Sequence, residues 1–321
     1  MNLAMIEAAA ARMAGHVRRT PLLNAPLLDR AVGRRVFVKA ESLQITGSFK
    51  ARGGWSAASA LPVEACKRGV IAFSSGNHAQ GVAYAAAAHG APCVILMPSD
   101  APAVKIANTR AYGAEVVLYD RATEDRDAIG ARLAEARGLT LIRPYDDPEV
   151  IAGQGTVGLE LADQAAEAGI THAPVFVCCG GGGLSSGIAL ALQALAPGLK
   201  VRTAEPVGFD DMARSLASGR RERNAAASGS ICDAILTPSP GELTFPILST
   251  LAGPGAVVTD DQALHAMALA FSHLRVVLEP GGAVALAAAL FGEDLPDTVI
   301  AVATGGNVER STFATALERF A

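Results

Sequence analysis

Positive charge and aromatic side chains are scarce in this sequence. Its 321 residues carry 27 Lys and Arg against 31 Asp and Glu, a net charge of −4, and only 5% are aromatic. A chain without excess positive charge does not attract phosphate polymers, so nucleic-acid binding is not expected. Long apolar runs are missing as well: the stretch over residues 282–291 falls well short of the ~20 residues that a membrane-spanning helix needs. We therefore expect no membrane segment.

Cysteine is also sparse, and its spacing excludes two common scaffolds. The five cysteines include no C-x-x-C pair, and an odd number in a chain of this length favours neither a disulfide framework nor a zinc ribbon. A reducing, cytoplasmic setting is the expectation. Glu7 interrupts the apolar N-terminal run and the arginines follow it, so residues 1–19 are interpreted as a helix rather than a transit peptide.

The sequence is rich in aliphatic residues and glycine: half of it is hydrophobic and 33 residues are Gly. Short β-branched runs alternate with Ala-rich stretches, which predicts an α/β fold with mostly parallel strands, because parallel neighbours need a crossover helix. The length suggests two domains, and since no linker separates two halves, the second would be inserted. The expected strands are 70–73, 94–97, 115–119, 175–179, 201–205 and 299–303, and the expected helices 82–88, 103–112, 123–137 and 188–195.

Four consecutive glycines at positions 180–183 follow an expected strand and precede an expected helix. Backbone without Cβ atoms can turn its N–H groups toward an anion, and a helix N-terminus adds partial positive charge, so this loop predicts a phosphate site. A flexible turn is the alternative. The dinucleotide pattern G-x-G-x-x-G is excluded, because it needs glycine at Ser185 or Ser186. The nucleoside-triphosphate loop is excluded because Ile188 and Ala189 stand where it needs Lys and Ser or Thr.

Lys50 stands in the motif S-F-K-A-R-G, just after a glycine turn. A single lysine is usually a solvated surface charge. Here Phe49 and Gly47 suggest a partly enclosed site, where a desolvated amine has a lowered pKa and can act as a nucleophile toward a carbonyl. A cofactor that carries both an aldehyde and a phosphate is indicated, and pyridoxal phosphate is that cofactor.

These motifs resemble the fold-type II, pyridoxal-phosphate-dependent serine/threonine dehydratase and serine racemase family, whose fold is that of the tryptophan synthase β subunit. The matching segments run in the family's order over nearly the whole chain, at residues 20–23, 48–53, 74–81, 97–117, 148–155, 180–183, 205–206, 279–283 and 304–308.

The resemblance implies a two-domain α/β fold with open, mostly parallel twisted sheets flanked by helices. Residues 1–66 and 148–321 would form a large cofactor-binding domain, and residues 67–147 a small inserted one. Because the chain ends soon after Thr304, the resemblance also implies the short, catabolic type without a regulatory C-terminal domain.

The same resemblance implies roles for individual residues. Lys50 would be joined to the cofactor aldehyde and would remove and return the Cα proton. Ser75 stands where the racemases carry a second catalytic residue. Phe49 would pack beside the pyridine ring, Asn77 would bond the cofactor's 3′-oxygen, and Thr304 would bond the pyridine nitrogen.

Two loops would hold the charged groups of cofactor and substrate. The resemblance assigns the phosphate to Gly180, Gly181, Gly182, Gly183 and Leu184, and the substrate carboxylate to Ser74, Ser75, Gly76, Asn77 and His78. His78 also has a structural interpretation, as a loop residue that never touches the substrate.

A hydroxyl at Thr304, in place of a carboxylate, does not keep the pyridine ring protonated, so a long-lived carbanion is disfavoured. Chemistry that expels a β-substituent is then preferred, which predicts an ammonia-lyase (dehydratase) that converts a threonine- or serine-like hydroxy amino acid to a 2-oxo acid and ammonia. Serine racemase is the alternative. Dehydratases of 3-hydroxyaspartate and of hydroxyectoine degradation also stay open, since Ala234 replaces a common family glycine near the substrate. A non-catalytic pyridoxal-phosphate-binding protein is the remaining alternative.

A divalent cation is a further expectation from metal-dependent relatives. Glu205, the main-chain carbonyl of Phe209, and Asp211 have the spacing of their ligands, and hard oxygen ligands suit Mg²⁺, Ca²⁺ or Mn²⁺. The alternative is that the two carboxylates face solvent at a strand end. The expected partners are a small amino-acid substrate and a second copy of the chain, because such relatives are usually dimers.

Overall fold

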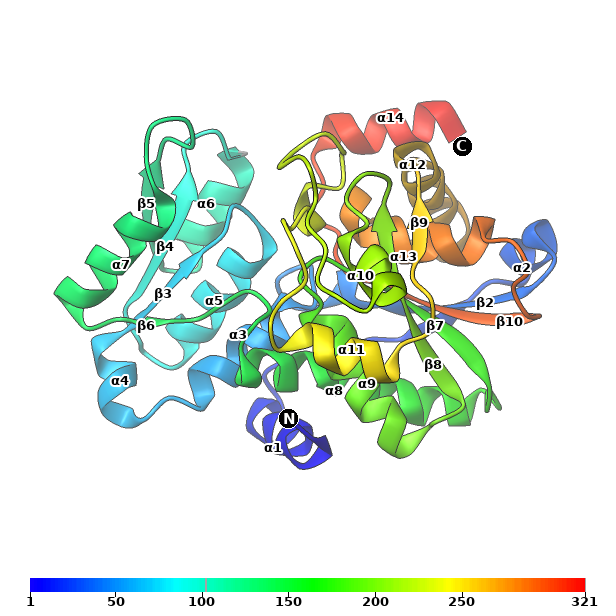
Figure 1. Cartoon of the computed structure of the whole chain (residues 1–321), viewed down its shortest axis with the longest axis horizontal. Coiled ribbons are helices and arrows are strands. Elements are labelled where there is room, and N and C mark those ends of the chain that lie inside the picture. Colours follow the sequence, from blue (N-terminus) through cyan, green and yellow to red (C-terminus); the bar gives the residue numbers. More distant parts are fainter. Residues whose placement is uncertain (102, 321) are drawn as a thin grey trace.

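The structure, a computed structural model, describes residues 1–101 and 103–320. Within these residues two separate sheets are flanked by helices, and Figure 1 shows the smaller sheet (cyan and green) beside the larger one. The predicted α/β class, with mostly parallel strands, is confirmed.

The larger sheet has six strands in the order β1-β2-β10-β7-β8-β9, and only β1 runs antiparallel to its neighbour. Its strands are β1 (Leu22–Asn24), β2 (Arg35–Ala40), β7 (Ala173–Cys178), β8 (Leu199–Pro206), β9 (Ala256–Val258) and β10 (Thr298–Ala303).

Helices cover both faces of this sheet, and the side chains of β10 alternate between them. Ala301 packs in the core on the side of α12 (Asp260–Leu269), α13 (Pro280–Phe291) and α14 (Arg310–Phe320). Ile300 and Val302 pack in the opposite core, with α8 (Pro148–Glu167) and α9 (Gly183–Leu195). Burial on both faces explains why β10 is apolar throughout and easy to recognise in the sequence.

The smaller sheet has four parallel strands in the order β5-β4-β3-β6. They are β3 (Val70–Phe73), β4 (Cys93–Pro98), β5 (Glu115–Tyr119) and β6 (Thr140–Leu141), and their helices are α5 (Asn77–Ala88), α6 (Ala103–Ala111) and α7 (Arg126–Arg137). All of these elements fall within residues 67–147. The domain boundaries at 66/67 and 147/148 stay a prediction.

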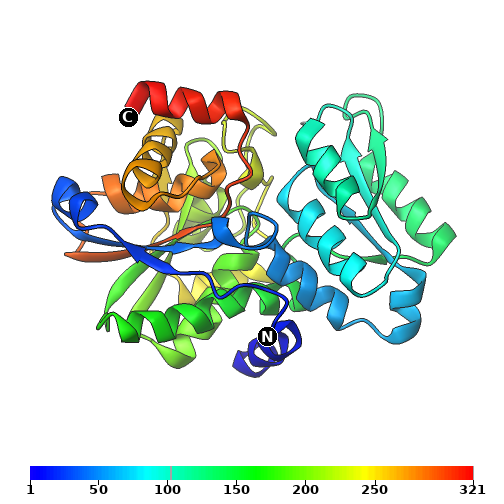
Figure 2. The ribbon, with the colours of Figure 1, turned by 180° about the vertical axis from the view of Figure 1, so that it is seen from behind.

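The remaining helices connect or cover the two sheets: α1 (Leu3–Met13), α2 (Pro26–Val32), η1 (Glu41–Leu43), α3 (Lys50–Ser59), α4 (Val63–Arg68), α10 (Asp211–Ser218), η2 (Asp233–Ile235), α11 (Thr244–Leu251) and the π-helical turn η3 (Ala270–Leu274). Helix α3 packs on α5 of the smaller sheet and on α8 of the larger one, and α1 packs on both α3 and α8. Figure 2 shows α1 (dark blue) below this junction, from behind. Helix α3 therefore joins the two halves of the molecule.

The predicted elements are found, and several others were not predicted. Each of the six expected strands is present, and the expected N-terminal helix is α1. Strand β2 and helices α3, α8 and α13 are additional. No helix in the part of the chain that the structure describes is long and apolar enough to cross a membrane.

Candidate active site

A cavity of about 980 Å³ is lined by residues from both sheets. The loop after β3 contributes residues 74–78, the loop after β7 residues 180–183, and the end of β10 is followed by Thr304; Lys50 lines the same cavity. Ligands of open parallel sheets bind at the carboxyl ends of the strands, and this cavity lies there. The structure thus brings together the residues that the sequence predicts for cofactor and substrate, including Phe49 and Leu184.

Lys50 is the first residue of α3, and its amine is enclosed. The Nζ atom donates a hydrogen bond to the main-chain carbonyl of Pro144 at 2.7 Å and lies 5.1 Å from the ring centroid of Phe49. Burial lowers the pKa of Lys50 from 10.5 to about 8. The neutral, nucleophilic form of the amine is therefore more accessible near neutral pH than in an ordinary lysine, in the direction that the sequence predicts.

The glycine loop needs its glycines. A Cβ on Gly181 would lie 2.2 Å from the ring of Tyr145, and Gly182 has a φ of +93°, in the left-handed region. Helix α9 begins at Gly183, so its free N–H groups face this loop. Ser185 in the first turn is fully buried, and its hydroxyl has no partner among the described residues. Bare main chain, a helix N-terminus and an unpartnered hydroxyl are features that would suit a phosphate, so the phosphate site predicted for this loop stays a prediction.

The side chain of Asn77, which follows the loop after β3, is held by two hydrogen-bond partners. The side-chain amide of Asn77 donates to the Glu279 carboxylate, and its carbonyl oxygen accepts from Asn307 at 2.7 Å. Glu279 is 2% exposed, and burial raises the pKa of its carboxyl to about 7, although the charge of Lys105 and the bond from Asn77 oppose this shift. Asn77 is therefore held by a titratable group that the sequence did not point out.

His78 turns its ring to the protein interior. Its Nε2 is 3.0 Å from the main-chain carbonyl oxygen of Ile142, and burial, together with the charge of Lys50, lowers the pKa of His78 to about 3. The imidazole is thus neutral at physiological pH. This geometry agrees with the structural interpretation of His78.

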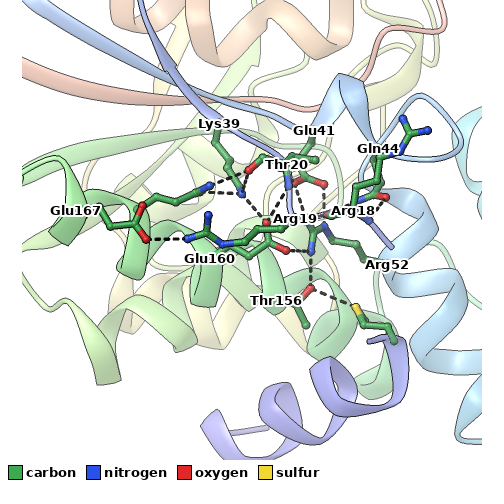
Figure 3. A network of polar contacts seen from close by, with 12 residues as sticks. Arg18, Arg19, Thr20, Lys39, Glu41, Gln44, Arg52, Thr156, Glu160 and Glu167 are labelled. Carbon is green, nitrogen blue, oxygen red and sulfur yellow. Dashed lines mark hydrogen bonds and ion pairs between the residues drawn. The ribbon is translucent and has the colours of Figure 1, made fainter. Parts of the chain in front are cut away.

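A buried ion network holds Arg52 of α3 (Figure 3). Arg52 is fully buried and pairs with Glu41 at 2.8 Å and with Glu160 at 2.7 Å, while Lys39 pairs with Glu160 at 2.5 Å. Burial disfavours the charged guanidinium, but the nearby carboxylates outweigh it and raise the pKa of Arg52. These bonds join the first turn of α3, which begins at Lys50, to η1 and α8.

Two cavity residues were missed by sequence reasoning. Glu279 lies in the segment 279–283, which resembles the family, but nothing in that segment indicates its contact with Asn77. Tyr145 carries no local signal: its ring is identified only by its contact with Gly181, which lies on another part of the chain.

The two carboxylates expected to bind a cation, Glu205 and Asp211, already have hydrogen-bond partners. Glu205 is fully buried and accepts from the main-chain N–H groups of Met212 and Ala213, each at 2.8 Å. Asp211 accepts from Asn224 at 2.6 Å through one oxygen, and its second oxygen has no partner among the described residues. Both carboxylates are buried, so the alternative interpretation, in which they face solvent at a strand end, is wrong. Across residues 1–101 and 103–320, no group of three or more His, Cys, Asp or Glu side chains is arranged to hold a metal ion.

Comparison with known proteins decides the family. The family described as "Pyridoxal-phosphate dependent enzyme" matches residues 13–305. The chain belongs to this family. It is 43% identical to an L-threo-3-hydroxyaspartate ammonia-lyase of Pseudomonas sp over 312 residues, which cover 97% of this chain and 96% of that protein.

Two solved structures resemble this pyridoxal-phosphate-dependent enzyme closely. A threonine deaminase from the organism abbreviated T.th. has a TM-score of 0.91 and 46% identity, covering 96% of this chain and 99% of that one. Maize serine racemase has a TM-score of 0.91 and 36% identity, covering 99% and 97%. The predicted family of fold-type II dehydratases and racemases, with its tryptophan synthase β-like fold, is confirmed.

The cavity of this pyridoxal-phosphate-dependent enzyme fits the cofactor. The enclosed amine of Lys50, with its lowered pKa, suits an aldehyde. The glycine loop, where a Cβ at Gly181 would collide with Tyr145, and the unpartnered Ser185 hydroxyl suit a phosphate. Both features line or adjoin the same cavity.

Proposed function

We propose that this protein is an ammonia-lyase that converts a 3-hydroxy amino acid to a 2-oxo acid and ammonia. The observation that carries the proposal is the enclosed Lys50 amine, with a pKa of about 8, in one cavity with the glycine loop and residues 74–78. Relatives named as ammonia-lyases of hydroxyaspartate and of threonine support the reaction class.

Pyridoxal phosphate, when bound, supplies an electron sink for the charge that develops at the substrate's Cα. The chain itself supplies acid–base chemistry and positioning. Nζ of Lys50 takes the Cα proton, and its lowered pKa suits a base at neutral pH. The loop at residues 74–78 binds the substrate carboxylate, and expulsion of the 3-hydroxyl as water precedes release of ammonia.

Further residues would hold the cofactor in the roles that the sequence suggests. Phe49 would pack beside the ring, Asn77 would bond its 3′-oxygen, and the loop from Gly180 to Leu184 would hold its phosphate. Thr304 is 5% exposed and would offer the pyridine nitrogen a neutral hydroxyl, which favours elimination over a long-lived carbanion.

Replacement of Lys50 tests the proposal. Lys50→Ala should lose both the yellow absorbance of the bound cofactor and the release of ammonia from serine, threonine or 3-hydroxyaspartate. Lys67→Ala is the matched control, because the Lys67 side chain is 67% exposed and is not part of the cavity lining. Full turnover in Lys50→Ala would refute the assignment, and a cofactor-loaded wild type that releases no ammonia would favour a non-catalytic binding protein.

Serine racemase is the second candidate, since Ser75 lines the same cavity as Lys50 and racemases are among the relatives. Chiral chromatography of serine incubations separates the two reactions. If the protein is a racemase, Ser75→Ala should reduce D-serine formation far more than oxo-acid formation.

We also propose a divalent cation at Glu205, Asp211 and the carbonyl of Phe209. What supports it is the burial of two adjacent carboxylates and the unpartnered second oxygen of Asp211. A rise in melting temperature with Mg²⁺, reversed by chelator and absent in Asp211→Asn, would support the site. An unchanged melting temperature in the wild type would contradict it.

A cytoplasmic homodimer remains the expectation for the assembly, and sedimentation of the purified protein tests the dimer.

A further inference from the structure

A second cavity, of about 200 Å³, lies on the larger sheet and shares no lining residue with the candidate active site. Strands β8 and β9 form one side of it, and residues between 287 and 295, at the end of α13 and just after it, form another. Apolar side chains, among them Phe176, Phe291 and Leu295, make most of its wall. Figure 1 shows β9 and α13 in the larger half of the molecule, away from the smaller sheet. The proposed reaction makes no use of this second cavity.

Arg202 of β8 brings a positive charge to this apolar wall. It is paired in register with Phe176, which packs in the core on the side of α13, and its guanidinium carbon is 5.0 Å from the centroid of that ring. Its Nε donates to the main-chain carbonyl of Pro254 at 2.9 Å, and its two terminal nitrogens have no partner among the described residues. Burial lowers the pKa of Arg202, and no carboxylate opposes this shift, in contrast to Arg52. The guanidinium is therefore held in place but not neutralised.

Two other polar side chains line the second cavity. The carbonyl oxygen of Gln262 accepts from the main-chain N–H of Thr259 at 2.8 Å in the cap of α12, which leaves its NH₂ group available as a donor. Glu293 is exposed and makes no ion pair within the part of the chain that the structure describes. Arg202 and Glu293 thus line one cavity without pairing with each other, so both charges are available to a ligand.

We propose that the second cavity binds an α-amino acid with a small aliphatic side chain, whose carboxylate contacts Arg202 and whose ammonium contacts Glu293. A guanidinium offers parallel N–H donors that match a carboxylate, and a carboxylate attracts an ammonium. The apolar wall suits the aliphatic side chain. The volume lies below the range of about 300–1,000 Å³ that drug-sized ligands occupy, so the ligand must be small. This site goes beyond the ammonia-lyase function and does not depend on it.

Calorimetric titration of the cofactor-loaded protein with L-valine tests the site. Two relatives of valine each lack one charge: 3-methyl-2-oxobutanoate has no ammonium, and isobutylamine has no carboxylate. The wild type should bind valine more tightly than either. Arg202→Met should weaken valine binding roughly 10- to 100-fold, the size of a lost charge-assisted hydrogen bond. Because Glu293 is exposed, Glu293→Gln should weaken it only a few fold, and it should abolish the preference for valine over the oxo acid.

Arg35→Met is the matched control, because the guanidinium of Arg35 also lies 5.0 Å from the centroid of a phenylalanine ring, that of Phe37, but outside the second cavity. It should bind valine like the wild type. The absorbance of the bound cofactor is recorded throughout, since valine that enters the active site would react with the cofactor and change it. An unchanged absorbance in ligand-free Arg202→Met shows that this variant is folded and loaded.

Four results would overturn the proposal. They are no binding of valine to the wild type, binding that appears only together with a changed cofactor absorbance, unweakened binding in folded Arg202→Met, and an equal loss in Arg35→Met. Binding of the oxo acid as tightly as valine to the wild type would also overturn it, because Glu293 would then have no part in recognition. None of these results bears on whether the enzyme releases ammonia, which the Lys50→Ala experiment tests separately.

Discussion

The main-chain carbonyl oxygen of Lys50 lies 2.5 Å from where a Cβ on Gly81 would stand. The contact is reciprocal, because a Cβ on Gly54 would lie 2.5 Å from the carbonyl oxygen of Gly81. Helices α3 and α5 therefore touch through bare backbone. Since α3 begins at Lys50 and α5 begins at Asn77, this contact fixes the spacing between two residues of the candidate active site.

Gly81→Ala should disturb both stability and activity. The added methyl would overlap with the backbone of Lys50, which cannot rotate away, and overpacking of this kind costs about 1–3 kcal/mol. We expect a lower free energy of unfolding in urea and a lower kcat, because α3 must shift. Gly253→Ala is the control, since its nearest neighbour, the Arg202 side chain, is 3.4 Å away. Equal behaviour of the two variants would show that the helix contact tolerates a methyl.

The lowered pKa of Lys50 predicts a pH-dependent stability of the cofactor-free protein. Between about pH 8 and pH 10.5 the unfolded chain binds a proton at Lys50 that the folded chain has lost, so the free energy of unfolding of the wild type rises with pH there. Lys50→Met has no amine to titrate, so its free energy of unfolding lacks this rise with pH. Its stability relative to the wild type should fall by about 1 kcal/mol per pH unit in that window.

Denaturant titrations of both proteins at pH 7.5, 8.5 and 9.5 measure this trend. The lost hydrogen bond to Pro144 shifts all three values alike, so only the slope reports the titration. Lys67→Met, at an exposed position, should show no slope. A pH-independent difference for Lys50→Met would mean that the amine keeps an ordinary pKa.

The buried network of Figure 3 predicts a large cost for Arg52→Met. Removing the guanidinium leaves Glu41, which is fully buried, without its ion-pair partner. Breaking a buried pair by removing one member costs about 3–5 kcal/mol, measured as the loss in free energy of unfolding. Arg137→Met, which breaks the exposed pair with Glu115, should leave stability nearly unchanged. Similar small effects in both variants would contradict a structural role for the network.

Much of the fold could be predicted because strands of the parallel sheets are short apolar runs between polar segments. Residues 115–119 are a strand with the predicted bounds. Strand β2 was not predicted because the buried Lys39 interrupts its apolar run, and only tertiary contacts, with Glu160, Thr20 and Gln164, explain that lysine. Helix α8 escaped because glycines are weak helix formers. Gly155 is required there, since its Cβ would lie 3.0 Å from the carbonyl oxygen of Gly187 in α9.

The residues of the candidate site also fall into those that the sequence predicts and those that only the tertiary structure identifies. Lys50 and the glycine loop could be predicted because their chemistry is local: an amine after a glycine turn, and bare main chain before a helix. The partners Tyr145 and Glu279 could not, because each acts through a contact with a distant segment. Sequence motifs show where the reacting groups are, and the tertiary structure determines what holds them.

Glu279 predicts a change in the pH profile of the reaction. Burial raises the pKa of its carboxyl to about 7, so it changes charge within the working range. The ionised carboxylate accepts the hydrogen bond from Asn77, whereas protonation turns one of its oxygens into a donor. We therefore expect kcat/KM of the cofactor-loaded enzyme to rise with pH through about 7. Glu279→Gln keeps an acceptor for Asn77 but cannot titrate, so it should flatten this rise.

The same variant has a stability signature of opposite sign to that of Lys50. A carboxyl whose pKa is raised on folding stabilises the folded state below its unfolded pKa of 4.5, and this contribution is lost as pH rises to about 7. Glu279→Gln should thus gain stability relative to the wild type between pH 5 and pH 7.5. Glu242→Gln, another acid of the cavity with a 79% exposed side chain, should change neither profile. If the rise in kcat/KM near pH 7 survives in Glu279→Gln, a different group controls it, and the raised pKa of Glu279 has no part in the reaction.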